Sequence, residues 1–212
     1  EGGEEGGERA REAIGRFVMG QQVRALEALE GLEGEVPTWL RARIQLEGGH
    51  WQSALNEVAN LSPESAVLHP VRVARLECLC LLGQADEAEQ ELAAIEAQTP
   101  DSPDCIYARG IVQESVGEYE EAARLYGQAL AIDPGNAPVL TDLGIMYRRS
   151  GQPEEAVRRF DLAIAADPKL ENARFNKGVV LLHDLNDRAG AIQAWEGLLA
   201  VNPLAMAPNG QS

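Results

Sequence analysis

The stretch NAPVLTDLGIMYRRSGQPEEAVRRFDLAIAADP, residues 136–168, contains two amphipathic segments separated by Gly151. Small residues at Gly144 and Ala156 precede a large residue at Phe160, and Pro168 closes the stretch. A helix is expected to end before this proline, because the residue preceding proline is disfavoured in the α region. The stretch therefore predicts two helices that cross where the small residues lie.

The same order of residues recurs every 34 positions towards the N-terminus. One step back it comprises Gly110, Gly117, Ala122, Tyr126, Ala129 and Pro134. Two steps back it comprises Gly83, Ala88, Leu92, Ile95 and Pro100, and three steps back Gly49, Trp51, Ala54, Val58 and Leu61. Residues 171–205 continue it with Gly178, Ala191, Trp195 and Pro203, but carry one extra residue near Asn186, which we expect in the turn. The chain is therefore a tandem array.

This pattern resembles the tetratricopeptide repeat, W-x2-L-G-x2-Y…A-x3-F…P over 34 residues, with Leu140 where the family usually has Trp. The resemblance covers residues 9–205 and implies an all-α fold, an α-solenoid (right-handed superhelix) of about six helix–turn–helix repeats. The expected repeats are 9–34, 35–68, 69–102, 103–136, 137–170 and 171–205. A disordered Gly/Glu tail at 1–8 is expected before them, and a C-terminal tail at 206–212 after them.

The charge of the chain limits the classes of partner. Asp and Glu number 34 against 18 Lys and Arg, giving a formal net charge of −16. This acidic balance argues against binding to nucleic acid or to an anionic membrane surface, since both require basic residues. No apolar run reaches the roughly 20 residues of a membrane span. Carboxylates such as Glu154 and Glu155 are expected at the starts of second helices, where the helix dipole stabilises them.

Neither the cysteines nor the histidines are spaced for catalysis or metal binding. The three cysteines cannot all pair within one chain and are interpreted as buried free thiols: Cys78, Cys80 and Cys105. Free thiols favour a reducing compartment such as the cytoplasm, with the periplasm as the alternative. The histidines lie in different repeats: His50, His69 and His183. No nucleotide-binding, metalloprotease or serine-hydrolase motif is present, so we expect no enzyme activity, cofactor or metal.

The resemblance also implies a binding surface, because the first helix of each repeat lines the inner face of such solenoids. Carried over by position, the expected partner-binding residues are Trp39, Arg43, Val73, Glu77, Tyr107, Ile111, Asp142, Ile145, Arg148, Arg149, Phe175, Asn176 and Val179. The Lys and Asn clamp with which some members hold a terminal carboxylate is not reproduced, since only Asn176 matches. An apolar, aromatic-lined face suits an extended peptide or an amphipathic helix.

We therefore expect a non-enzymatic scaffold or adaptor that binds a protein or peptide partner. The ending AIQAWEGLLAVNPLAMAPNGQS resembles bacterial assembly-factor proteins, so an assembly factor for an envelope or cytochrome c maturation system is one alternative. A regulatory segment of a longer enzyme is another. A third is self-association through the last helix, at 189–201, which would expose some of Ile192, Trp195, Leu198 and Leu199.

Overall fold

The computed structural model describes residues 2–18, 21–59, 61 and 68–202. In these ranges it contains twelve α-helices and no strand. The chain divides into two compact units, Glu1–Ile95 and Glu96–Ser212, each of which is described by itself. The predicted all-α fold of solenoid type is confirmed.

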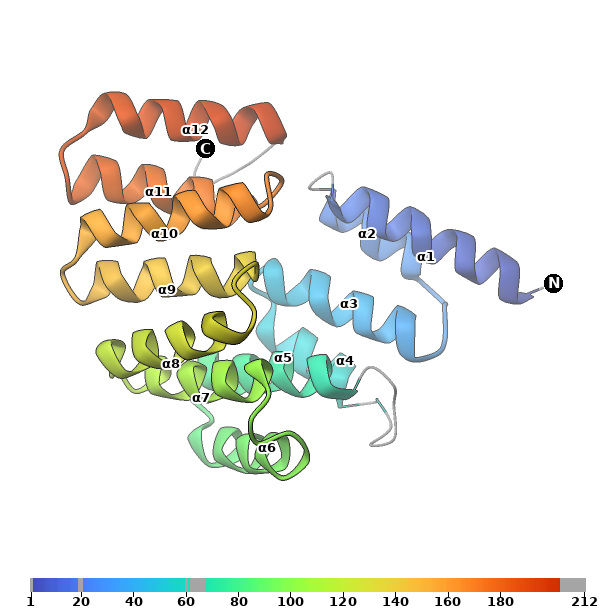
Figure 1. Ribbon diagram of the computed structural model, residues 1–212. Coiled ribbons are helices and arrows are strands. Elements are labelled where there is room, and N and C mark those ends of the chain that lie inside the picture. Colours follow the sequence, from blue (N-terminus) through green and yellow to red (C-terminus); the bar gives the residue numbers. More distant parts are fainter. Residues whose placement is uncertain (1, 19–20, 60, 62–67, 203–212) are drawn as a thin grey trace. The chain divides into compact units, whose positions relative to one another are not determined.

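The helices follow one another in pairs (Figure 1). The first unit contains α1 (Gly2–Val18), α2 (Gln22–Leu29), α3 (Glu35–Glu47), α4 (Trp51–Val58) and α5 (Leu68–Leu81). Helix α6 (Ala85–Gln98) crosses the division between the units. The second unit contains α7 (Pro103–Ser115), α8 (Tyr119–Ile132), α9 (Ala137–Arg149), α10 (Pro153–Ala166), α11 (Glu171–His183) and α12 (Arg188–Val201). One pair overlaps each expected repeat range, although α1 begins at Gly2 and α5 at Leu68, ahead of the expected starts. The repeat boundaries stay a prediction.

Each helix of the second unit packs on its neighbours in the chain. Helix α8 contacts α7 and α9, α10 contacts α9 and α11, and α12 contacts α11. Figure 1 shows α9 to α12 lying one above the next. The first unit is built the same way, with α3 packed against α2, α4 and α5. A core that runs along the stack of repeats is what distinguishes a solenoid from a globular bundle.

From the second repeat to the sixth, the turn between the two helices depends on one residue in the left-handed region. Gly117 (φ 85°) and Gly151 (φ 77°) occupy this position in the second unit, where a residue with a Cβ would be strained. In the sixth repeat Asn186 takes the role with φ 55°, and asparagine tolerates this conformation better than most residues. The extra residue of this repeat lies in the turn between α11 and α12, as expected from the sequence.

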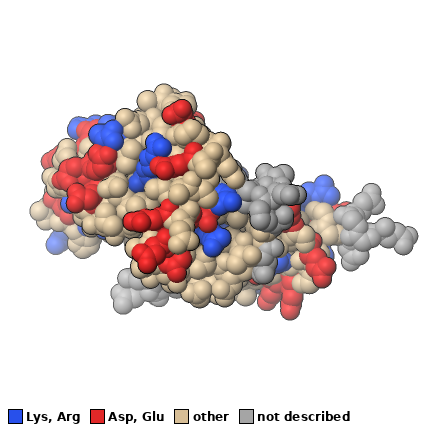
Figure 2. All heavy atoms as spheres, turned by 90° about the horizontal axis from the view of Figure 1, so that it is seen from below, with Lys and Arg blue, Asp and Glu red and all other residues tan. Residues whose placement is uncertain are grey.

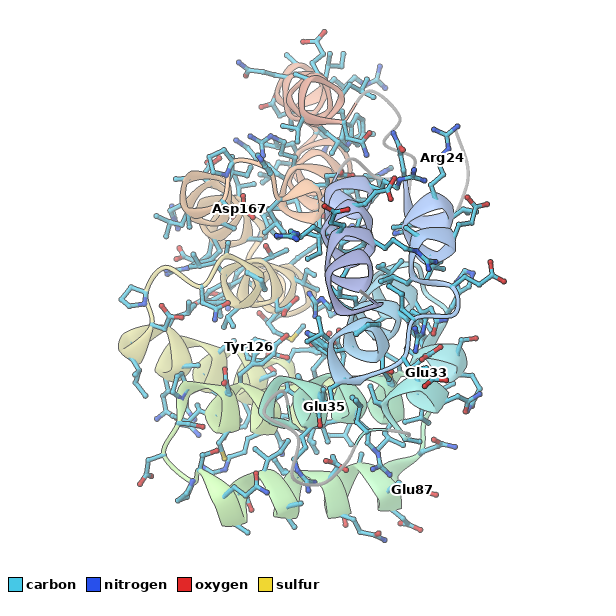
Figure 3. The ribbon with its side chains drawn as sticks, turned by 90° about the vertical axis from the view of Figure 1, so that its right-hand side faces the viewer. Arg24, Glu33, Glu35, Glu87, Tyr126 and Asp167 are labelled. Carbon is cyan, nitrogen blue, oxygen red and sulfur yellow. The ribbon has the colours of Figure 1, made fainter. Side chains whose placement is uncertain are left out.

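In the last three repeats, the two helices are held close by a glycine that faces an aromatic ring. A Cβ added at Gly144 would lie 2.6 Å from Cε1 of Phe160, whose side chain is fully buried. Gly110 faces the ring of Tyr126 and Gly178 faces Trp195 in the same way, at even shorter approach. Figure 3 shows Tyr126 among the packed helices of its unit. The glycine of the first helix therefore makes room for an aromatic ring of the second helix. This ring lies four residues after the small alanine, as Phe160 follows Ala156.

Polar side chains cap several helix starts. Ser102 Oγ accepts the backbone N–H of Cys105 at 3.0 Å at the start of α7, and Asp187 accepts that of Gly190 at 2.9 Å at the start of α12. Glu154 and Glu155 lie in the first turn of α10, as predicted. Glu33, Glu35 and Glu87, labelled in Figure 3, are exposed.

The N-terminal segment differs from the expectation. Residues 2–8 belong to α1, whereas their Gly and Glu composition predicts a disordered tail. Two features favour the helix: acidic residues are stabilised near a helix N-terminus, and Arg9 Nη2 donates to the carbonyl of Glu30 at 2.7 Å, joining α1 to the end of α2. The predicted helix end at Gly20, the break at residues 62–63, Pro203 and the tail at 206–212 lie outside the described residues.

Candidate functional site

The expected partner-binding residues are distributed over both units, and four of them belong to the first. Trp39 and Arg43 lie on α3, Val73 and Glu77 on α5, and all four are half-buried. Trp39 packs against two core clusters, one around Ala42 and Val58 and the other around Ala54 and Cys78. Much of its indole therefore serves the core of the first unit, and part of it stays accessible.

In the second unit, a hydrogen bond joins the first helices of two successive repeats. Tyr107 Oη on α7 donates to Asp142 Oδ2 on α9 at 2.7 Å. The Tyr107 ring also packs against the ring of Tyr126, with centroids 5.3 Å apart and planes at 40°. Tyr107 and Asp142, the two members of the predicted set, are both half-buried. The hydrogen bond between them holds the Tyr107 side chain in one orientation, with part of it accessible.

Tyr126 extends this group to a carboxylate on α7. Its hydroxyl donates to Glu114 Oε2 at 2.9 Å. Burial raises the pKa of Glu114, and the hydrogen bond from Tyr126 and the charge of Arg149 act in the opposite direction. Glu114 is not in the predicted set of partner-binding residues, although it lies on the same helix as Tyr107.

The polar residues expected to anchor a partner already have bonds within the unit. Arg148 Nε donates to Asp184 Oδ2 at 2.6 Å, across from α9 to the end of α11. Arg149 donates to Tyr119 Oη at 3.1 Å, and its guanidinium lies 5.2 Å from the centre of that ring. Asn176 Nδ2 donates to the carbonyl of Asn172 at 2.9 Å. A partner would therefore have to share or replace these bonds.

The apolar members of the predicted set differ in accessibility. Ile145, Phe175 and Val179 are half-buried on α9 and α11, whereas Ile111 is only 6% exposed. Ile111 therefore has little surface for a partner. The carbonyl of Phe175 accepts the indole N–H of Trp195 at 3.2 Å, which ties the backbone of α11 to α12. We define the first-helix face as six half-buried members of the predicted set, leaving out Arg148 and Arg149, which are also accessible but bond to Asp184 and Tyr119. The six are Tyr107, Asp142, Ile145, Phe175, Asn176 and Val179.

A pocket of about 360 Å³ between α10, α11 and α12 lies outside the predicted set. Its polar side chains include Arg174 and the ion pair of Lys177 Nζ with Asp161 Oδ1, 2.6 Å apart. Gly190 and Gly197 line it from α12. These two glycines, seven residues apart on one helix face, are the sequence signal that indicates an opening here.

Three observations on the described residues concern metal ions, membrane crossing and thiol reactivity. Across the described ranges, no group of three or more His, Cys, Asp or Glu side chains is arranged to hold a metal. None of the described helices combines the length and apolar character that crossing a membrane requires. Burial, followed by the charge of Glu77, raises the pKa of the Cys78 thiol to about 12, which disfavours a reactive thiolate. Cys78 and Cys105 are buried, as predicted, whereas Cys80 is only half-buried.

The accessible charge is largely acidic. Figure 2 shows Asp and Glu gathered in several groups on one face, with Lys and Arg among them. Many arginines are paired within a helix, as Arg124 is with Glu121 at 2.6 Å, and as Arg158 and Arg159 are with Glu155. A surface of this kind does not provide the continuous basic stripe that nucleic acid requires.

Comparisons with known proteins agree with the geometry. Two family models, both described as tetratricopeptide repeat, match residues 77–137 and 115–178. A comparison with curated protein sequences found no match. Among solved structures, a thermophilic tetratricopeptide repeat protein of Thermus thermophilus is 22% identical, with a TM-score of 0.66 over 84% of this chain and 99% of its own. A tetratricopeptide repeat protein from Parabacteroides merdae is 16% identical, with a TM-score of 0.68 over 91% of this chain and 77% of its own.

Proposed function

Because the chain is a tetratricopeptide repeat protein, a class whose repeats generally mediate protein–protein interaction, we propose that it is a scaffold that binds a peptide or an amphipathic helix. In the second unit the partner binds on the first-helix face. The observation that carries this proposal is the hydrogen bond from Tyr107 to Asp142, which fixes an aromatic side chain at the surface between two repeats.

The chemistry of this face supports a peptide partner. Accessible aromatic and aliphatic side chains, here Phe175, Ile145 and Val179, supply the buried contacts that dominate affinity at peptide interfaces. Asn176 and Asp142 add polar groups that fix the orientation of a backbone. Tyr107 is already held by its hydrogen bond, so little conformational entropy is lost when a partner covers it. The alternatives of an assembly factor and of a regulatory segment of a longer enzyme stay predictions.

The proposal is tested with peptides selected from a random display library on the wild-type chain. Their affinities are then measured for Phe175→Ala and Ile145→Ala and for a matched control, Leu162→Ala. Leu162 is 49% exposed on α10, a second helix, so it belongs to a different face. We expect each variant of the first-helix face to lose about tenfold or more in affinity. The control is expected to change by less than about twofold.

If the selected peptides bind the two variants as tightly as they bind wild type, the binding site does not lie on the first-helix face. Peptides that lose affinity only on Leu162→Ala would place it on the second helices. Circular dichroism of each variant verifies that the fold is retained.

A further inference from the structure

The last described helix presents an apolar stripe interrupted by one carboxylate. Ile192 is 56% exposed and Leu199 48% exposed, and Glu196 between them is exposed as well. Residues spaced by four and then three lie on one side of a helix. An adjacent side of α12 is packed, since Leu198 is 6% exposed and Trp195 lies against Gly178. Of the four residues considered for exposure on this helix from the sequence, Ile192 and Leu199 are exposed.

One repeat earlier the two apolar positions of the stripe are partly covered. Allowing for the extra residue in the last turn, Ile192, Glu196 and Leu199 correspond to residues of α10: Val157, Asp161 and Ile164. The two apolar members are half-buried there, because α10 packs against the first helix of the next repeat, α11. The carboxylate of Asp161 is paired with Lys177 of α11 at 2.6 Å.

The helix that meets this stripe on α10 has a defined chemistry. Lys177 supplies the positive charge for the carboxylate, and Leu181, one helical turn later, lines the same pocket as Val157 and Ile164. A helix with a basic residue and a leucine four positions later therefore matches an apolar–acidic–apolar stripe. On α12, Glu196 provides the corresponding acidic centre.

We propose that the stripe formed by Ile192, Glu196 and Leu199 is a second docking surface, whose occupant is a basic amphipathic helix of another protein. This stripe is separate from the first-helix face, so a negative result for the stripe would leave the proposed function unaffected. The net charge of −16 favours a basic partner over a second copy of this acidic chain.

The probe is a synthetic peptide of residues 168–185, acetylated and amidated at its ends, which carries Lys177 and Leu181. Its binding to the full chain is followed by fluorescence anisotropy. We expect Glu196→Lys in the protein to weaken binding about fivefold, and Lys177→Glu in the peptide to do the same on the wild-type protein. The two changes together are expected to restore binding to within about twofold of wild type.

The apolar part of the stripe is tested with Ile192→Ser/Leu199→Ser, which should weaken binding of the same peptide about tenfold or more. The matched control is Leu162→Ser on α10, an equally exposed leucine outside the stripe, for which no change is expected. Circular dichroism shows whether each variant keeps its helices, and the charge reversal gives a second readout that does not alter the apolar residues.

Four results would each overturn the proposal. The first is equal binding of the peptide to wild type and to the Ile192→Ser/Leu199→Ser protein, or no binding to either at about 1 mM. The second is charge changes that simply add. The third is a dimer in sedimentation equilibrium that this variant lacks, which would make a second copy the occupant. The fourth is a gain of about tenfold in peptide affinity on deletion of residues 203–212, which would show that the chain covers its own stripe.

Discussion

Replacing Gly144 by alanine should destabilise the second unit, although alanine is the better helix former. The added Cβ would lie 2.6 Å from Cε1 and 2.9 Å from Cδ1 of Phe160. Phe160 is fully buried, so its ring cannot move into solvent. Overpacking of this kind costs about 1–3 kcal/mol, and the close approach favours the upper end, while the gain in helix propensity is about 1 kcal/mol. We therefore expect a net loss of about 2 kcal/mol in the free energy of unfolding.

A matched control separates the clash from the propensity. Gly127 lies inside α8, is exposed, and would have no atom within 4 Å of an added Cβ. Gly127→Ala should therefore raise the stability by about 0.5–1 kcal/mol. Both variants are compared with wild type by urea unfolding followed by circular dichroism, and by thermal melting.

A double-mutant cycle identifies the ring as the cause. The second repeat has Ala42 and Val58 at the positions of Gly144 and Phe160, and there they pack together in one cluster. Phe160→Val alone should cost about 2–3 kcal/mol. In combination with Gly144→Ala the loss should be smaller than the sum of the two single losses by about 1–2 kcal/mol. A Gly144→Ala protein that melts at or above the wild-type temperature, or a strictly additive cycle, would refute the reasoning.

Three further outcomes follow from buried groups. Burial raises the pKa of Cys78 to about 12, so this thiol should be alkylated only when the protein unfolds, whereas the half-buried Cys80 should react first. Mass spectrometry of the labelled peptides gives the order of reaction. Alkylation of Cys78 before Cys80 would contradict this prediction. Burial raises the pKa of Glu114, so the contribution of this carboxyl to stability is largest below about pH 4.3 and is lost as the pH rises through the raised pKa. Glu114→Gln should therefore flatten the fall in the urea unfolding midpoint between acidic and neutral pH. An unchanged dependence of the midpoint on pH would contradict the effect of burial on Glu114. Glu91 is 6% exposed and paired with two arginines of α5, so Glu91→Ala should lower the free energy of unfolding by about 3 kcal/mol. Glu121→Ala is the control, since the Glu121 side chain is 43% exposed in its pair with Arg124. Equal unfolding midpoints of the two variants would show that the pairing of Glu91 is not needed.

The fold was predictable because side-chain size recurs in phase along the sequence. The spacing of Gly110, Gly144 and Gly178 indicated where helices approach closely, and the extra residue near Asn186 indicated a longer turn. Periodicity alone could not identify what each glycine faces. The ring over Gly144 belongs to Phe160, and that depends on the rotation of one helix about its axis as well as on spacing.

The candidate site was less predictable, because hydrogen bonds between repeats depend on three-dimensional neighbours. Position in the repeat put Tyr107 and Asp142 into the predicted set, and both are half-buried, but nothing in the sequence pairs them. The partner of Arg148, Asp184, lies 36 residues away at the end of α11, out of step with the 34-residue period. The N-terminal residues of α1 were also missed, since Gly and Glu have little apolar surface and the contact of Arg9 with Glu30 has no local signature.

The glycine–ring pairs also have a consequence for how the chain assembles. Near-identical repeats can exchange partners during folding, so that a second helix docks on the wrong first helix. Here α7 offers a glycine where α5 offers Leu76, which is fully buried. The Tyr126 ring would collide with that leucine, so α8 is rejected by α5 and accepted by α7. The unequal side-chain volumes at these positions thus specify which first helix each second helix packs against. A chain in which all repeats were identical would be expected to mispair its helices more often during folding.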